Sequence, residues 1–360
     1  MISGNSHWKC KPFILKPVGK DYLWGGTRLN DDFSKNLPQN PLAESWECST
    51  HPQGESIVAT GAFTGRTLRQ VLIDHPEFLG SNHKGQQELP ILVKLIDANK
   101  DLSVQVHPDD AYAAEHENGA LGKTEMWYVL DAEPGAQLVY GLKHSISSEE
   151  LKKSAMDGTI VRHMHTVNVK PGDIFFIEPG TIHAIGHGIL IAEIQESSNL
   201  TYRLYDYDRV DKNGNRRELH LHKAAEVANL QGISAPRQPM RVLKYRPGCA
   251  QEHLCRCKYF EVSRMLLNTE RIRGFVVYSA DENAYRVMLC TDGCGSIVME
   301  DGENLPFFRG DCLFVPAGAE KIRFHGKAEF LDIRGQYCSR RQKGYPQYSC
   351  GIALYLQAIM

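Results

Sequence analysis

Short, β-strand-like segments separated by turn residues are the feature that most constrains the fold of this chain. Between residues 91 and 205 these segments are rich in Val, Ile, Tyr and Phe, and Gly, Pro or Asp divides one from the next. They read ILVKLI, LSVQVH, EMWYVLD, AQLVYG, VNVK, DIFFIEP, ILIAEIQ and TYRLY. Short strands at this spacing are typical of sandwiches and barrels, so we expect an all-β protein.

Helical patterns are few. The sequence predicts short amphipathic helices at 67–75, 109–116, 148–157 and 219–230. Pro108 precedes the second of these helices, and Ser148 is the expected N-cap of the third. We therefore expect a few short helices at the periphery of the β structure.

The length of the chain predicts two domains, because 360 residues exceed what one ordinary core organises. Residues 231–250 are rich in Pro, Gly and Arg, and we interpret them as a linker, after which strand-like segments resume. We predict a first domain at residues 1–240, a second at 241–335, and a tail at 336–360 whose structure the pattern does not indicate.

An internal repeat links the two predicted domains. Residues 172–183 read GDIFFIEPGTIH, and residues 310–321 read GDCLFVPAGAEK. Each has Gly-Asp, an apolar strand and a turn containing Pro and Gly; the first copy ends on His183 and the second on Lys321. The repeat predicts that the first domain carries a site that the second has lost, with chance similarity as the alternative.

Charge and composition exclude several classes of partner. The formal net charge is -2, and no basic stripe favours nucleic acid. No apolar run is long enough to span a bilayer, and the first residues lack the apolar segment of a signal peptide. The spacings of the ten cysteines match no common zinc motif. We expect a cytoplasmic protein with reduced thiols and with no nucleic-acid or membrane partner.

Polar residues in otherwise apolar strands predict a metal site. In SVQVHPDD, alternation places Gln105 and His107 on one face of a strand. His183 begins the strand that follows the first repeat, and Glu125 begins the apolar segment EMWYVL, where a buried acid needs a partner. Two imidazoles and one carboxylate suit zinc, iron(II) or manganese, and Gln105 is the weakest of the four candidates. Each histidine taken singly is more often a satisfied polar residue than a ligand.

Several separated motifs resemble one known family. In chain order they are YLWGGTRL, AESWECSTHPQGES, QVHPDD, GKTE, PGTIHAIG and TYRLYDYDR. They resemble the type I mannose-6-phosphate isomerases, in the short form typical of bacteria such as Bacillus, over roughly residues 11–335. The resemblance implies two jelly-roll (cupin) domains, the second degenerate, one zinc ion per chain, and interconversion of mannose 6-phosphate and fructose 6-phosphate.

The resemblance also implies roles for particular residues. It places the metal ligands at Gln105, His107, Glu125 and His183. It matches Arg203 to a catalytic arginine, and it matches Lys123 and Glu193 to two candidates for the base. Aldose–ketose isomerisation needs such a base, a stabiliser for charge on two sugar oxygens, and a cation for the phosphate.

Other interpretations remain open from the sequence. Arg203 could instead pair with Asp206 or Asp208, and Lys123 could serve as a partner for Glu125. Iron(II) dioxygenases also use a cupin fold with a metal site of two histidines and one carboxylate. A non-catalytic sugar-binding cupin is a further alternative, against which the presence of Lys123, Glu193 and Arg203 together argues.

Overall fold

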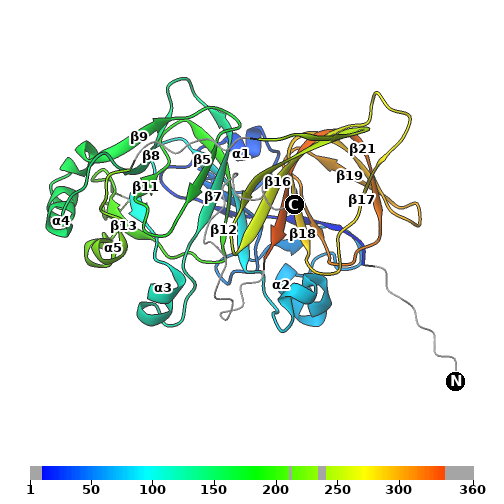
Figure 1. Ribbon diagram of the computed structural model, residues 1–360, viewed down its shortest axis with the longest axis horizontal. Helices are drawn as coiled ribbons and strands as arrows, with labels where there is room; N and C mark the ends of the chain where they lie inside the picture. The colour runs from blue at the N-terminus through cyan, green and yellow to red at the C-terminus, as the bar shows by residue number, and fades with distance from the viewer. Residues whose placement is uncertain (1–9, 211–212, 234–240, 337–360) are drawn as a thin grey trace, which may run out of the picture. The chain divides into compact units, whose positions relative to one another are not determined.

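The structure is a computed structural model that describes residues 10–210, 213–233 and 241–336 (Figure 1). β-Strands make up most of its regular structure, they pair in antiparallel sheets, and the helices are short. The predicted all-β class with a few short helices is therefore confirmed.

The chain divides into two compact units, each made of separate stretches. The middle unit comprises Val18–Trp46 and Ile91–Gln238, and the outer unit comprises Met1–Pro17, Glu47–Pro90 and Pro239–Met360. The sequence predicts one first domain through residue 240, whereas two stretches before residue 91 group with the strands beyond that residue. The predicted boundaries of the two functional domains stay a prediction.

Long-range strand pairing explains the grouping of the early stretches. Strand β1 (Phe13–Lys16) pairs with β20 (Cys312–Val315) on one side and with β4 (Ile57–Val58) on the other. Hydrophobic periodicity indicates that a segment is a strand, but it does not indicate which distant strand lies beside it.

Two sheets form the middle unit. The six-stranded sheet has the order β10 (Ile174–Ile177), β7 (Glu125–Ala132), β12 (Ile189–Glu196), β5 (Ile91–Ala98), β3 (Glu44–Cys48) and β2 (Val18–Lys20). The five-stranded sheet has the order β13 (Tyr202–Tyr205), β6 (Val104–Val106), β11 (His183–Ala184), β8 (Gln137–Leu142) and β9 (Met164–Asn168). Every residue of β5 and of β12 is buried, as expected of central strands that are covered on both faces.

Four helices lie inside the four predicted ranges. They are α2 (Leu68–Asp74), α3 (Asp110–His116), α4 (Ser148–Met156) and α5 (Leu221–Val227). The sequence did not predict α1 (Arg28–Asp31) or the short 3₁₀ helices Pro76–Leu79, Ser81–His83 and Thr159–Arg162. No helix in the described part of the chain is both long and apolar enough to cross a membrane.

The predicted N-cap of α4 is wrong by one residue. Ser147 has an extended backbone and its hydroxyl accepts a hydrogen bond from the Glu150 amide at 3.1 Å, so Ser147 is the cap and Ser148 is the first helical residue. Two adjacent serines look alike in sequence, and only the backbone conformation separates them.

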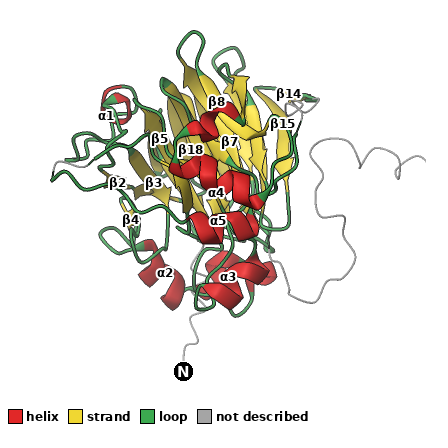
Figure 2. Cartoon of the chain, turned by 90° about the vertical axis from the view of Figure 1, so that its left-hand side faces the viewer, coloured by secondary structure: helices red, strands yellow, loops and turns green. Residues whose placement is uncertain are grey.

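Apolar side chains from both sheets of the middle unit meet in one core. Trp127 and Ile191 of the six-stranded sheet belong to the same buried cluster as Leu138 of the five-stranded sheet. A second cluster joins β6 and β13 to Leu151 of α4 and Ala224 of α5, which lie beside each other (Figure 2). The five-stranded sheet therefore has one face toward the other sheet and one toward these helices.

One ten-stranded sheet forms the outer unit. Its main path is β14 (Lys244–Arg246), β15 (Cys249–Arg256), β16 (Phe260–Asn268), β21 (Ile322–Gly335), β18 (Arg286–Val298), β20, β1 and β4. Two further strands, β17 (Val276–Tyr278) and β19 (Asn304–Phe308), pair with β21 and β18. The predicted tail at 336–360 lies, except for Gln336, outside the described residues.

The predicted linker at 231–250 is wrong in its second half. Strands β14 and β15 form a hairpin in which Arg246 pairs with Cys249 across Pro247 and Gly248. Gly248 has a φ of 77°, a conformation that this tight turn requires and that glycine adopts without strain. A Pro-Gly pair serves a hairpin turn as well as a linker, so composition misidentified it; residues 234–240 lie outside the described ranges.

The two copies of the repeat share their conformation. In the first, Asp173 accepts a hydrogen bond from the Lys170 amide at 3.0 Å; in the second, Asp311 accepts one from the Phe308 amide at 2.8 Å. Each turn leads into an apolar strand, β10 or β20, so the strands predicted for both copies are confirmed. The copies differ at their ends, because His183 is buried whereas Lys321 is exposed.

The capping assignment makes a prediction about stability. Ser147→Ala removes the acceptor for the Glu150 amide and should lower the free energy of unfolding by about 1 kcal/mol. Ser148→Ala is the matched control and should change it by less than about 0.5 kcal/mol, since alanine is favourable inside a helix. Chemical denaturation of the three proteins measures the difference, and equal effects of the two substitutions would contradict the assignment.

Candidate metal centre

The strand register places the predicted site residues on the facing sides of the two sheets in the middle unit. In the five-stranded sheet, Gln105 of β6 lies directly opposite His183 on one side and Arg203 on the other. Cross-strand neighbours of this kind share a face of the sheet. The valines on either side of Gln105 point instead into the core under α4 and α5, so the predicted alternation along β6 is confirmed.

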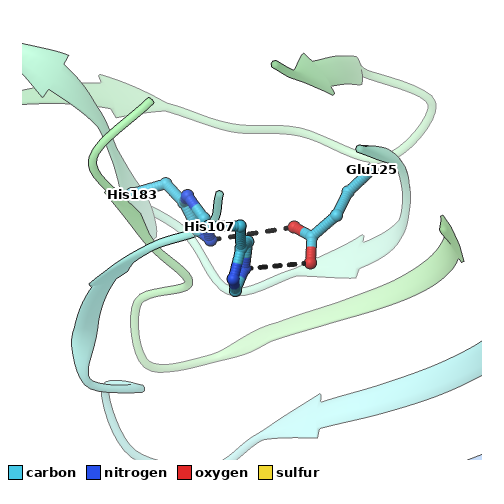
Figure 3. Close-up of side chains that lie close together, drawn as sticks. All are labelled: His107, Glu125 and His183. Atoms are coloured by element: carbon cyan, nitrogen blue, oxygen red, sulfur yellow. Dashed lines mark ion pairs between the residues drawn. The ribbon is translucent and has the colours of Figure 1, made fainter. Parts of the chain in front are cut away.

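Three buried side chains converge in this space. Nε2 of His107 lies 3.2 Å from Oε1 of Glu125, and Nε2 of His183 lies 3.7 Å from Oε2 of the same carboxylate (Figure 3). One ligand atom from each residue can be chosen so that all lie within 4.8 Å of one another. Their side chains are at most 1% exposed. The predicted convergence of His107, Glu125 and His183 is therefore present.

The hydrogen bonds of these residues fit a bound metal ion. Nδ1 of His183 lies 2.8 Å from the carbonyl oxygen of Thr181, which can only accept, so Nδ1 carries the proton and Nε2 presents a lone pair. Among the described residues, Nδ1 of His107 has no hydrogen-bond partner. Buried polar atoms left in this way are uncommon unless an ion or a ligand satisfies them.

The local electrostatics favour the protonation states that bind metal. Burial, and then the nearby Lys123 ammonium, lower the pKa of His107 to about 3. Burial alone would raise the pKa of Glu125, but Lys123 and the two histidines outweigh it and hold that pKa well below the usual range. At neutral pH the histidines are neutral and the carboxylate is ionised, as metal ligation requires.

Gln105 and Lys123 complete the immediate surroundings. The Gln105 amide nitrogen lies 3.3 Å from Nε2 of His183, so the side chain reaches the cluster, while its role as a ligand stays a prediction. Nζ of Lys123 lies 2.7 Å from Oε1 of Glu125 and 3.4 Å from Nε2 of His107. The pairing of Lys123 with Glu125, considered as an alternative from the sequence, is therefore present in the structure.

A second buried ion pair lies on the six-stranded sheet. Lys94 of β5 is opposite Glu193 of β12, and its Nζ lies 3.2 Å from Oε2 of that acid and 3.7 Å from Oε2 of Glu44. Glu193 also accepts a hydrogen bond from the Trp127 indole at 3.0 Å. Burial raises the pKa of Glu193, and the negative charge of Glu125 raises it further. The Lys94–Glu193 pair therefore interacts electrostatically with a residue of the metal cluster.

Sequence reasoning missed Lys94. Burial alone would lower the pKa of this lysine, but Glu44, Glu193 and Glu125 outweigh it and raise the pKa. One signal could have found the residue: a lysine interrupts the apolar segment ILVKLI, and a charge inside a central strand requires a partner.

Comparisons with known proteins identify the family of this chain. A family model described as phosphomannose isomerase type I, catalytic domain, matches residues 13–133. Over 329 residues the chain is 38% identical to mannose-6-phosphate isomerase ManA of Bacillus subtilis, which covers 89% of this chain and 98% of that protein. The chain belongs to the type I phosphomannose isomerase family.

Further relatives of this family support the assignment. Over 228 residues the chain is 46% identical to the probable mannose-6-phosphate isomerase GmuF of Bacillus subtilis, a match that covers 63% of this chain and 71% of that protein. A crystal structure of the mannose 6-phosphate isomerase from Bacillus subtilis superposes with a TM-score of 0.82 at 34% identity, covering 89% of this chain and 99% of that one.

In this member of the type I phosphomannose isomerase family, the side chain of Arg203 forms hydrogen bonds with neutral groups. Its Nη1 donates to the Glu218 carbonyl at 2.8 Å, and its Nε lies 3.3 Å from the Ser103 hydroxyl. The aspartates considered as partners are engaged elsewhere: Asp206 pairs with two other arginines, Arg209 and Arg217, and Asp208 pairs with Arg216. Among the described residues Arg203 makes no ion pair, so its charge is available to a ligand.

Removal of one ligand should test the cluster. His183→Ala should abolish tight metal binding, because two remaining ligands cannot hold the ion in a site built for three. The matched control is His187→Ala, since this exposed histidine lies on the same segment and outside the cluster. Metal content per chain after dialysis, measured by mass spectrometry, decides; a His183→Ala protein with full metal content would contradict the site.

Proposed function

We propose that this protein is a zinc-dependent isomerase that interconverts mannose 6-phosphate and fructose 6-phosphate through an enediol. The observation that carries the proposal is the buried cluster of His107, Glu125 and His183 beside two lysines and a second carboxylate, Glu193. This cluster lies in a chain that matches nearly the whole length of a protein named mannose-6-phosphate isomerase.

The metal would be held by His107, Glu125 and His183, with Gln105 as the fourth candidate ligand. Zinc suits two imidazoles and one carboxylate, and the side chains present the right protonation states for it. A zinc ion bound there would act as a Lewis acid on the sugar oxygens at C1 and C2. A sugar phosphate is the ligand class that this assignment implies.

Lys123 and Glu193 are the two candidates for the base. In the forward direction a base removes the proton from C2 of the aldose, and the enediol forms as a proton reaches the carbonyl oxygen O1. The proton returns to C1 as O2 loses its own, which leaves the ketone at C2. Burial keeps the pKa of Glu193 raised, so its carboxyl group is nearer to neutral-pH proton exchange than an exposed glutamate.

Lys94 would adjust the pKa of the candidate base Glu193 and would not act as the base itself. Its ammonium contacts Glu193 at 3.2 Å and lowers the pKa that burial would otherwise raise further. The Trp127 indole fixes the other oxygen of that carboxyl group at 3.0 Å. Both contacts hold Glu193 in one orientation on the face of β12 that is shared with Lys94 and Trp127.

Arg203 would supply positive charge to the substrate. Arg203 lies beside Gln105 in the sheet. Burial is the main reason that the pKa of Arg203 is lowered, and the positive charges of Arg217 and Arg209 lower it further. Guanidinium groups bind phosphate in two-point contacts and also stabilise negative charge on oxygen. Arg203 is therefore suited to the phosphate or to the charge that develops on the sugar oxygens.

Turnover before and after metal removal tests the function. The protein as isolated should convert mannose 6-phosphate to fructose 6-phosphate, chelation should abolish the activity, and added Zn²⁺ should restore it, because the proposed chemistry requires the ion. A coupled assay for fructose 6-phosphate measures the rate. Metal binding without turnover would favour a sugar-binding cupin, and metal-dependent oxygen consumption would favour an iron(II) dioxygenase.

The assigned role of Arg203 gives a further prediction. Arg203→Ala should lower kcat/KM for mannose 6-phosphate by about 100-fold, the range seen when one charge-stabilising donor is lost. Metal content and the denaturation midpoint should stay close to those of the unaltered protein, since the Arg203 guanidinium hydrogen-bonds only a carbonyl and a hydroxyl within the described part of the chain.

Arg216→Ala is the matched control for Arg203→Ala. Arg216 is 68% exposed, pairs with Asp208 at 2.9 Å and belongs to the same unit, so its loss should leave turnover unchanged. Loss of metal in Arg203→Ala would indicate a structural role, and unchanged kcat/KM would refute its part in catalysis.

A further inference from the structure

The segment Gly122–Thr124, which carries Lys123 and leads directly into Glu125, is held at each of its backbone amides. The Gly122 amide donates to Oδ1 of Asp110 at 3.1 Å, and the Lys123 amide donates to the Pro108 carbonyl at 3.0 Å. The Thr124 amide donates to Oε1 of Glu196 at 2.8 Å. Three consecutive amides therefore have fixed acceptors, and two of those acceptors are side-chain carboxyl groups.

The two carboxyl groups come from segments that also supply site residues. Asp110 begins α3, three residues after the candidate ligand His107. Glu196 ends β12, three residues after the candidate base Glu193. A contact from each to the Gly122–Thr124 segment therefore ties that segment to two other parts of the site.

We propose that Asp110 and Glu196 are positioning residues of the isomerase, which hold the Gly122–Thr124 segment so that Lys123 and Glu125 keep their places in the metal site. The inference rests on the proposed function, because it concerns the residues assigned there as base and ligand. Neither Asp110 nor Glu196 is proposed to touch the substrate or the metal.

The packing around the segment is tight enough for small displacements to matter. A Cβ atom at position 122 would lie 2.5 Å from the Asp110 amide nitrogen, so only glycine fits this approach. Glu196 makes a second contact, because its own amide donates to the Thr124 carbonyl at 3.1 Å. Thr124 lies between Lys123 and Glu125, so a shift of its backbone moves both functional side chains relative to the histidines on other strands.

Glu196 is buried, with 1% of its surface exposed. Burial, and then the adjacent Asp110 carboxylate, raise the pKa of Glu196 to about 8. Its Oε1 accepts from the Thr124 amide, and among the described residues its Oε2 has no hydrogen-bond partner. A glutamine side chain has the same length and keeps an oxygen that can accept from the Thr124 amide, which makes Glu196→Gln a conservative replacement.

A purely structural role is the competing explanation, and it predicts different kinetics. Loss of a buried hydrogen bond anywhere in the unit lowers stability, but only a displaced Lys123 or Glu125 lowers turnover in the folded, metal-loaded enzyme. Asp97 provides the matched control. It is also buried, and its Oδ2 accepts the Arg28 amide at 3.0 Å, at a helix that carries no site residue.

The experiment compares Glu196→Ala, Glu196→Gln and Asp97→Ala with the unaltered full chain, each loaded with Zn²⁺. Mannose 6-phosphate turnover, bound zinc and the denaturation midpoint are measured for all four proteins. We expect Glu196→Ala to lower kcat by about tenfold or more with little change in KM, because the reacting groups are misplaced. We expect Glu196→Gln to stay within about twofold in kcat. Asp97→Ala should lose stability but keep its kcat.

Several outcomes would overturn the inference. These are a folded Glu196→Ala protein with normal kcat, a Glu196→Gln protein as slow as Glu196→Ala, or an equal loss of kcat in Asp97→Ala. If Glu196→Ala does not fold, Asp110→Ala takes its place, because Asp110 is only partly buried. A tenfold lower kcat in Asp110→Ala supports the inference, and a normal kcat refutes it. An unaltered protein without turnover would refute the proposed function itself, whereas turnover that no substitution affects would refute the inference alone.

Discussion

The carboxyl group of Glu125 lies between two β-sheets, has no exposed surface, and has a pKa that is held well below its usual range. Taking a carboxylate out of water costs on the order of several kcal/mol unless cations and hydrogen-bond donors surround it. The middle unit meets this constraint with Lys123 at 2.7 Å and with two imidazoles, one that directly follows strand β6 of the facing sheet and one on its strand β11. The arrangement of the rest of the site follows from the need to place positive or metal-binding groups around one buried oxygen pair.

Strand register supplies the required precision. On the six-stranded sheet, Lys94, Glu193 and Trp127 occupy one cross-strand row. On the five-stranded sheet, Gln105 lies between His183 and Arg203. The Trp127 and His183 rings meet edge to face with their centroids 5.4 Å apart, which links the two rows. A slip of one residue in either sheet would turn these side chains into the opposite core, so the fold and the site are specified by the same pairing.

The repeat indicates how one turn can be used with and without a site. Both copies use an aspartate to hold the amide three residues earlier, and both then enter an apolar strand. Only the first copy continues into a buried histidine, whereas the second continues into the exposed Lys321. The shared part of the repeat thus has a structural reason, and the residue that differs is the one with chemistry.

The sequence by itself determined the β class, the four longer helices, the strands that carry Glu125 and His183, and the strand that ends just before His107. Alternation and turn residues are local signals, so they can be read in each strand separately. The sequence also indicated that Gln105 and His107 share a face. It did not determine which strands are neighbours. The grouping of strand β1 with the outer unit, the partners of Lys94 and the two carboxyl groups on the Gly122–Thr124 segment all depend on contacts between residues far apart in the chain. Even the hairpin at Gly248 and the cap at Ser147 needed the backbone conformation, since Pro-Gly and Ser-Ser fit more than one local structure. Burial and charge pairing are properties of the packed chain, so tertiary structure alone decided which polar residues became a site.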